Sequence, residues 1–171
     1  MVIPFFGLLV LLAQASPGNA PGDAYFGKLN MSTLRIRYET MQLKKRYETH
    51  QLLPEQAEHL LIFTDDAYMD WARRYPKDGW LPSTGFAIAQ LYAELPGATA
   101  RGRAAALLKY VAQSFPKSPY AHKSRVQLNR GVSMKPYPAW ARPTPTPSPS
   151  PAPSPSSATS PSPAPSRASR L

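Results

Sequence analysis

The chain has 171 residues, a length typical of a single domain, and it contains no cysteine. The lack of cysteine excludes disulfide bonds, thiolate metal sites and a cysteine nucleophile. The net charge is +10, but residues 1–95 hold nine Lys/Arg and ten Asp/Glu, whereas residues 96–171 hold eleven Lys/Arg and no acid. This asymmetry indicates either an anionic partner for the C-terminal half or cations that are merely solvated.

The N-terminus carries the pattern of a cleavable signal peptide over residues 1–15. A short apolar run, Ile3 to Leu12, precedes Ala13-Gln14-Ala15, which fits an A-x-A cleavage site. The run is too short to span a bilayer, so we expect no transmembrane span after cleavage; an uncleaved anchor is the alternative. Export to the periplasm or the extracellular side of the cell envelope is predicted. Residues 16–31 begin with turn-forming residues and are interpreted as a linker.

Apolar residues at helical spacing between prolines predict a helical, repeat-like domain over residues 32–135. Its first helix, about 32–50, has two apolar stripes, so we expect it to be buried on two sides. The stripes are Leu34, Tyr38 and Met41 on one face and Ile36, Leu43 and Tyr47 on the other. The second helix begins at Pro54, which suits a first helical position, and ends before Pro76.

Three further helices are predicted, which makes an all-α fold of about five helices. The third starts after Pro82, the fourth ends at Pro116, and the fifth runs from about Pro119 to Arg130. Short turns between them imply antiparallel neighbours, and no segment predicts a strand. Residues 136–171 are rich in Pro, Ser and Ala, a composition that buries too little apolar surface to fold. We interpret this tail as a disordered spacer.

Two segments of the chain can be superimposed. Thr64, Tyr68, Trp71 and Pro76 correspond in order to Ala104, Leu108, Val111 and Pro116, at a constant offset of 40 residues. This internal repeat favours stacked helical pairs. The spacing resembles the second helix of a tetratricopeptide repeat, and the first-helix pattern of that family is matched by Ile88, Ala89 and Tyr92. The turn over residues 115–121 looks like that of outer-membrane assembly lipoproteins.

The resemblance covers about residues 55–131 and implies a short right-handed α-solenoid of antiparallel helix pairs. A generic five-helix bundle is the alternative. The resemblance also implies a concave groove lined by the first helix of each pair. In this sequence, the groove would place Phe86, Gln90 and Glu94 beside Lys123, Gln127 and Arg130. An extended peptide or an acidic tail could lie there.

No catalytic, cofactor or metal site is predicted. Glu55 and His59 lie one helical turn apart, but two ligands are too few for a metal site. The aspartates of the second helix are explained by ion pairs with the arginines that follow at helical spacing. These residues are Asp65, Asp66 and Asp70, then Arg73 and Arg74. The aromatic residues Trp71, Tyr75 and Tyr92 are expected in the core, and Trp80, in a turn, is expected to be exposed.

Three functions remain open at this point. The leading hypothesis is an exported, non-catalytic scaffold of the cell envelope that binds a protein or peptide segment, with an acidic segment favoured by the basic C-terminal half. The alternative is a structural protein that binds a polyanion, such as anionic lipid or wall polymer. Export makes nucleic acid a poor candidate. The third hypothesis is an enzyme whose site has an unrecognised pattern.

Overall fold

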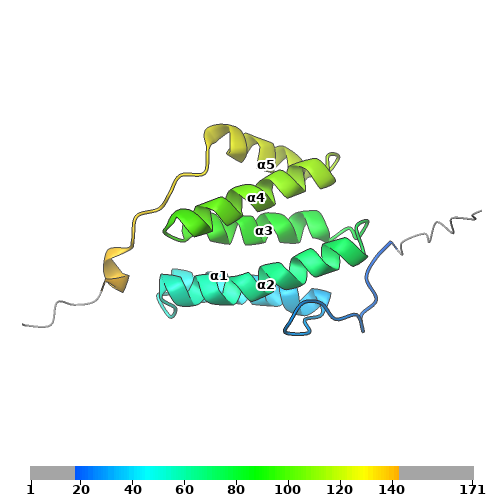
Figure 1. The fold of residues 1–171 in the computed structure, drawn as a ribbon, viewed down its shortest axis with the longest axis horizontal. Coiled ribbons are helices and arrows are strands. Elements are labelled where there is room, and N and C mark those ends of the chain that lie inside the picture. The colour runs from blue at the N-terminus through cyan, green and yellow to red at the C-terminus, as the bar shows by residue number, and fades with distance from the viewer. Residues whose placement is uncertain (1–17, 143–171) are drawn as a thin grey trace, which may run out of the picture.

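The structure is a computed structural model that describes residues 18–142. The predicted signal peptide and the tail from residue 143 onward lie outside the described residues. Five α-helices and no strand occur in the described part, so the predicted all-α fold is confirmed (Figure 1). The helices are α1 (Thr33–Glu48), α2 (Pro54–Arg74), α3 (Leu81–Glu94), α4 (Ala98–Ser114) and α5 (Pro119–Arg130), followed by a 3-10 turn, η1 (Ala139–Ala141).

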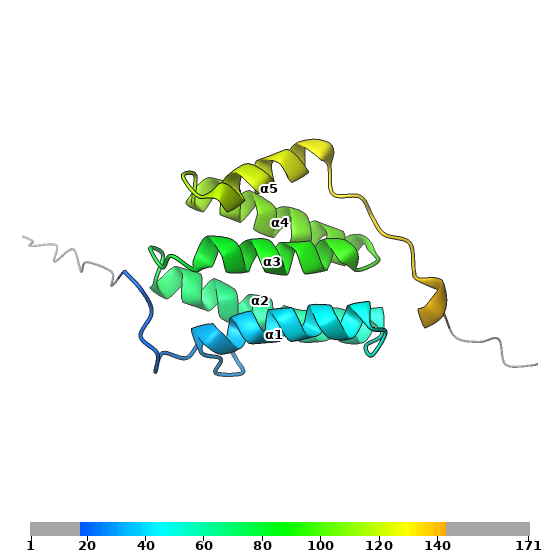
Figure 2. The same cartoon turned by 180° about the vertical axis from the view of Figure 1, so that it is seen from behind.

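The helices form two layers. Figure 1 shows α2 and α4 in front, and Figure 2, from behind, shows α1, α3 and α5 in front. Consecutive helices are antiparallel, which makes helices of one layer parallel. The Arg37 guanidinium on α1 lies 4.2 Å from the Trp80 ring just before α3, and Lys44 pairs with Glu94 at the other end. This packing is compatible with the predicted α-solenoid.

The repeated turns have the same backbone conformation. Tyr75, after α2, has φ −128° and ψ 60°, and Phe115, after α4, has φ −127° and ψ 54°. In each turn, the backbone N–H of the residue three positions after the aromatic residue donates to the aromatic residue's carbonyl oxygen. The N···O distance is 3.0 Å from Asp78 to Tyr75 and 2.9 Å from Ser118 to Phe115. Proline after each aromatic residue ends the helix because it disfavours the helical conformation before it. The sequence repeat is therefore also a structural repeat.

The core lies between the two layers. Tyr68 and Trp71 of α2 and Tyr92 of α3 are fully buried, as predicted for Trp71 and Tyr92, while Tyr75 is half-buried. The Tyr68 hydroxyl donates to the Leu81 carbonyl at 3.2 Å. A Cβ at Gly85 would overlap that hydroxyl, so glycine allows α2 and α3 to approach closely.

The prediction that α1 is buried on two sides is wrong. Ile36 and Leu43 are buried, but the other apolar stripe is exposed. The exposed fractions are 63% for Leu34, 55% for Tyr38 and 58% for Met41. No helix within residues 18–142 covers this stripe: α1 packs on α2 behind it and on α3 beside it, and no helix lies in front of α1 in Figure 2.

The segment expected to be a linker packs against the domain. Phe26 is 1% exposed and makes an edge contact with Tyr75 at 5.8 Å between ring centroids. Backbone N–H groups of the segment donate to α2 carboxylates, from Gly27 to Asp70 at 3.1 Å and from Lys28 to Asp66 at 3.3 Å. Residues 18–31 are thus part of the folded unit, and the linker interpretation is corrected accordingly.

The chain after α5 also remains packed beyond residue 135, the predicted domain boundary. Residues 131–142 return from the last helix to the end of the first (Figure 2). The Trp140 ring stacks on His50, with 4.3 Å between centroids, and contacts Tyr47 edge-on. The folded unit therefore extends at least to residue 142.

Candidate interaction groove

A groove of about 650 Å³ lies between α1 and α3, on the three-helix layer seen in front in Figure 2. Its lining is largely apolar, and its two cations, Arg37 and Lys44, both come from α1. The lining residues are Arg37, Tyr38, Thr40, Met41, Lys44, Ser83, Thr84, Phe86, Ala87 and Gln90. Two of the six predicted site residues, Phe86 and Gln90, belong to it.

The α1 wall comes from the exposed stripe. Leu34, Tyr38 and Met41 recur at i, i+4 and i+7 and therefore share one helix face. Tyr38 and Met41 line the groove directly. Single exposed apolar side chains are ordinary, but a contiguous apolar stripe beside a hollow is typical of an interaction site.

The α3 wall connects the groove to α5. The Phe86 ring lies 5.7 Å from the Tyr120 ring, and the Gln90 amide donates to the Gln127 side-chain oxygen. The structure therefore brings Phe86, Gln90 and Gln127 together, on two neighbouring parallel helices.

Glu94, predicted for the same groove, faces α1 instead of α5. Its carboxylate lies 2.8 Å from Lys44 Nζ, and Glu48 lies 3.4 Å from the same nitrogen. The hydrogen bond to Glu94 raises the pKa of Lys44 above its ordinary value. Lys44 is shared by Glu94 and Glu48, so the three side chains together carry one negative charge on the α1 side of α3.

Lys123 and Arg130 line a separate hollow of about 530 Å³ on α5, together with Gln127. The Lys123 ammonium lies 5.4 Å from the Tyr120 ring. Within residues 18–142 neither cation has a carboxylate within 4.0 Å. The α5 end of the layer is consequently basic.

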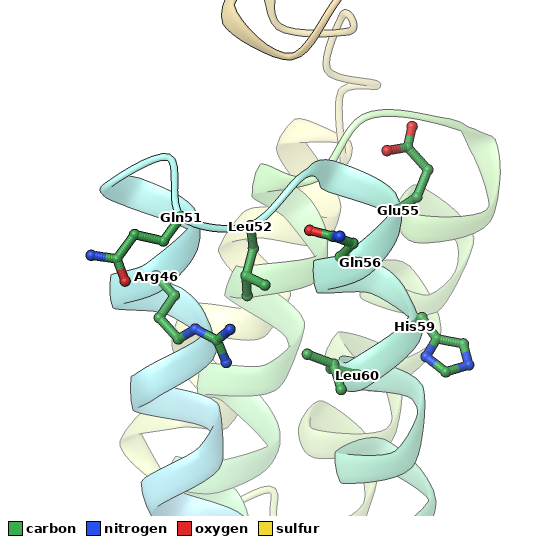
Figure 3. Close-up of a pocket in the computed structure, with 7 residues that line it drawn as sticks. All are labelled: Arg46, Gln51, Leu52, Glu55, Gln56, His59 and Leu60. Atoms are coloured by element: carbon green, nitrogen blue, oxygen red, sulfur yellow. The ribbon is translucent and has the colours of Figure 1, made fainter.

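A third hollow, of about 600 Å³, lies at the turn between α1 and α2 (Figure 3). Its lining residues are Arg46, Gln51, Leu52, Glu55, Gln56, His59 and Leu60. Figure 3 shows Glu55 and His59 on the side of α2 away from α1, so they do not converge with Arg46. Within residues 18–142 no cluster of three or more His, Asp or Glu side chains is placed to hold a metal ion.

The α2 aspartates have three different roles. Asp70 pairs with Arg73 at 3.4 Å and with Arg74 at 2.6 Å, as predicted. Asp66 accepts from the N-terminal segment, as described above. Asp65 is buried and pairs with Arg103 of α4 at 3.2 Å. The prediction of local helix pairs is therefore confirmed for Asp70 and wrong for Asp65 and Asp66, whose contacts are with residues far away in sequence.

The α1 side of the groove was not predicted. Periodicity shows that a stripe of a helix is apolar, but it does not show whether another helix covers that stripe.

No helix within residues 18–142 is long and apolar enough to cross a membrane. Comparisons with protein-family models, with curated proteins and with solved structures gave no match for the chain.

Proposed function

We propose that this protein is an exported, non-catalytic scaffold of the cell envelope whose groove between α1 and α3 binds a protein segment. Export is supported by the apolar run and A-x-A pattern of residues 3–15. A tetratricopeptide-like mode of binding is supported by the repeated turns and by the parallel α1, α3 and α5 layer, whose exposed face corresponds to the groove that the resemblance implies.

The observation that carries the proposal is the exposed stripe of α1 beside the groove. Leu34, Tyr38 and Met41 are each more than half exposed, whereas most large apolar side chains of the described residues are buried or half-buried. Burying a fully exposed Leu or Met side chain contributes about 1.5–3 kcal/mol, and these side chains, a little over half exposed, can contribute roughly half of that before ordering costs are subtracted. Three of them next to a groove can therefore anchor a short segment.

The test is selection of random peptides displayed on phage against the full-length chain. Affinities of the recovered peptides are then compared for two variants that place the same lysine on different faces, Met41→Lys in the groove and Met69→Lys on α2, where Met69 is 37% exposed. We expect Met41→Lys to weaken binding about tenfold or more, because 1.4 kcal/mol corresponds to a factor of ten. Met69→Lys should leave it unchanged.

Failure to enrich any peptide would contradict the groove proposal. Equal weakening of binding by Met41→Lys and Met69→Lys would also contradict it, because the peptides would then bind outside the groove or respond only to the added charge.

A second candidate, binding of a polyanion, is favoured by one observation. Residues 96–142 contain nine Lys/Arg and no acid, and only Arg103 among them pairs with a carboxylate in the described part of the chain. Binding to vesicles of anionic lipid would fall steeply as salt rises, because it depends on screened charges. Binding at the apolar stripe would persist in high salt.

A further inference from the structure

We infer that the bound segment is bipartite, with apolar side chains seated between α1 and α3 and carboxylates placed against α5. This inference rests on the proposed function and specifies the chemistry of the partner. It follows from the way apolar and charged side chains are divided across the three parallel helices.

The apolar half is the part nearest α1. Tyr38 and Met41 line the groove from one side and Phe86 from the other. The cations at its edge are already engaged, since the Arg37 guanidinium lies over the Trp80 ring and Lys44 is bridged to Glu94. Apolar contact therefore dominates recognition in this half.

The polar boundary lies between α3 and α5. The Gln90 and Gln127 side chains hydrogen-bond to each other there, so each amide satisfies part of the other's hydrogen-bonding capacity. Glu94, the one acid of α3, is paired with Lys44 of α1. Glu94 is thus held towards α1, and α5 contains no acid, so the acids of the layer lie on the α1 side of this boundary.

The cationic half is α5. Lys123 and Arg130 have exposed side chains and no carboxylate partner within residues 18–142. The two lie seven residues apart, close to two helical turns, so they share one side of α5. Cations placed together in this way are complementary to two or more carboxylates of a partner.

The chain itself is a poor source of these carboxylates. Asp65, Asp66, Asp70 and Asp78 accept hydrogen bonds from the chain's own backbone or side chains, and Glu94 is paired with Lys44. Glu39 and Glu48 are also in ion pairs, so seven of the ten acids are engaged and a second copy would offer α5 no more than Asp23, Glu55 and Glu58. An acidic segment of another protein is the better occupant.

The layer geometry also sets the spacing within the segment. Neighbouring packed helices lie about 8–10 Å apart, so the groove centre and α5 are separated by about 12–15 Å. An extended chain advances about 3.3 Å per residue. The carboxylates should therefore lie about four residues from the apolar anchor.

The phage selection described above tests this inference through the sequences recovered. We expect an apolar or aromatic pair, with Asp or Glu clustered about four residues away. Lys123→Glu combined with Arg130→Glu should weaken these peptides about tenfold at low salt, because two exposed charge contacts are reversed. The control is Lys109→Glu with Lys117→Glu, which changes the net charge equally at exposed positions outside α5 and should alter binding less than twofold.

Two results would overturn the bipartite segment but not the groove proposal. One is that the recovered peptides contain no Asp or Glu; the other is that Met41→Lys weakens their binding while the double α5 variant does not. Acidic peptides that respond to the α5 reversal but not to Met41→Lys would overturn it in favour of polyanion binding. Failure to enrich any peptide would overturn both proposals.

Discussion

Asp65 is a buried acid of α2 whose carboxylate meets side chains of two other helices. Its Oδ2 accepts from Arg103 at 3.2 Å and from the Tyr92 hydroxyl at 3.4 Å, whereas Oδ1 has no partner among the described residues. Burial raises the pKa of Asp65 above its ordinary 3.8, and the Arg103 guanidinium opposes that rise. Burial also raises the pKa of Tyr92, so its hydroxyl remains a donor at neutral pH. The group links α2, α3 and α4.

This arrangement predicts a specific pH dependence. Because the pKa of Asp65 is higher in the folded chain, the folded chain holds the proton more tightly. The resulting stabilisation is fully present below pH 3.8 and is lost as pH rises through the raised pKa. We expect the free energy of unfolding of the native chain, measured relative to Asp65→Asn, to fall over that range. Urea unfolding at a series of pH values measures it.

A second variant checks the cause. Arg103→Met removes the guanidinium that opposes the effect of burial, so it should enlarge the fall and destabilise the chain by about 1–3 kcal/mol at neutral pH. If the difference in free energy of unfolding between the native chain and Asp65→Asn did not change with pH, the pKa of Asp65 would be the same in the folded and unfolded chain, which would contradict the prediction.

Among the elements, the segment 18–31 differs most from expectation. Its glycines and prolines predict turns, and turns are present, but they deliver Phe26 into the core and backbone donors to Asp66 and Asp70. Gly27 is needed in this position because its φ is +65° and its backbone lies against Ala67. A segment without helical periodicity can thus be integral to a helical domain.

Two adjacent aromatic residues test this element. Phe26→Ala should destabilise the chain by about 3–5 kcal/mol, because it empties a fully buried ring site. Tyr25 is 56% exposed and Tyr25→Ala keeps the backbone carbonyl that accepts from Arg74, so its effect should stay within about 0.5 kcal/mol. Denaturant unfolding compares the two. Similar values for both would contradict the packing described for residues 18–31.

The helices themselves were largely predictable because prolines mark their ends. Pro54 and Pro119 begin helices, and Pro76 and Pro116 follow their last turns, so local steric rules fixed the bounds. The N-terminal segment and the return of residues 131–142 were not predictable, because both depend on contacts between residues far apart in sequence. Asp65 was misassigned for the same reason: its partner, Arg103, lies 38 residues away.

The candidate site was predictable only in part. Phe86, Gln90 and Gln127 were found from the repeat pattern, because equivalent positions on parallel helices lie side by side. The α1 side could not be found in this way, since an apolar stripe gives no sign of whether the fold covers it. For the stripe of Leu34, Tyr38 and Met41, the sequence pattern predicted burial, whereas the structure shows exposed side chains.

On the scale of the whole molecule, the two layers have different surfaces. In the layer of α1, α3 and α5, the groove between α1 and α3 has a largely apolar lining and the hollow on α5 is lined by Lys123 and Arg130, while all acids of the chain lie before residue 95. The central claim is that this layer, rather than the α2 and α4 layer, receives a protein segment.

The methionines provide the most direct measurement of that claim. Among the described residues Met41 lies in the groove, Met69 is exposed on α2, Met134 is exposed after α5, and Met31 is buried. The chain would be labelled with ¹³C at the methionine methyl groups and titrated with a selected peptide. The account predicts that the Met41 methyl signal moves while the Met69 and Met134 signals stay in place. Movement at Met69 or Met134 with an unchanged Met41 signal would contradict it.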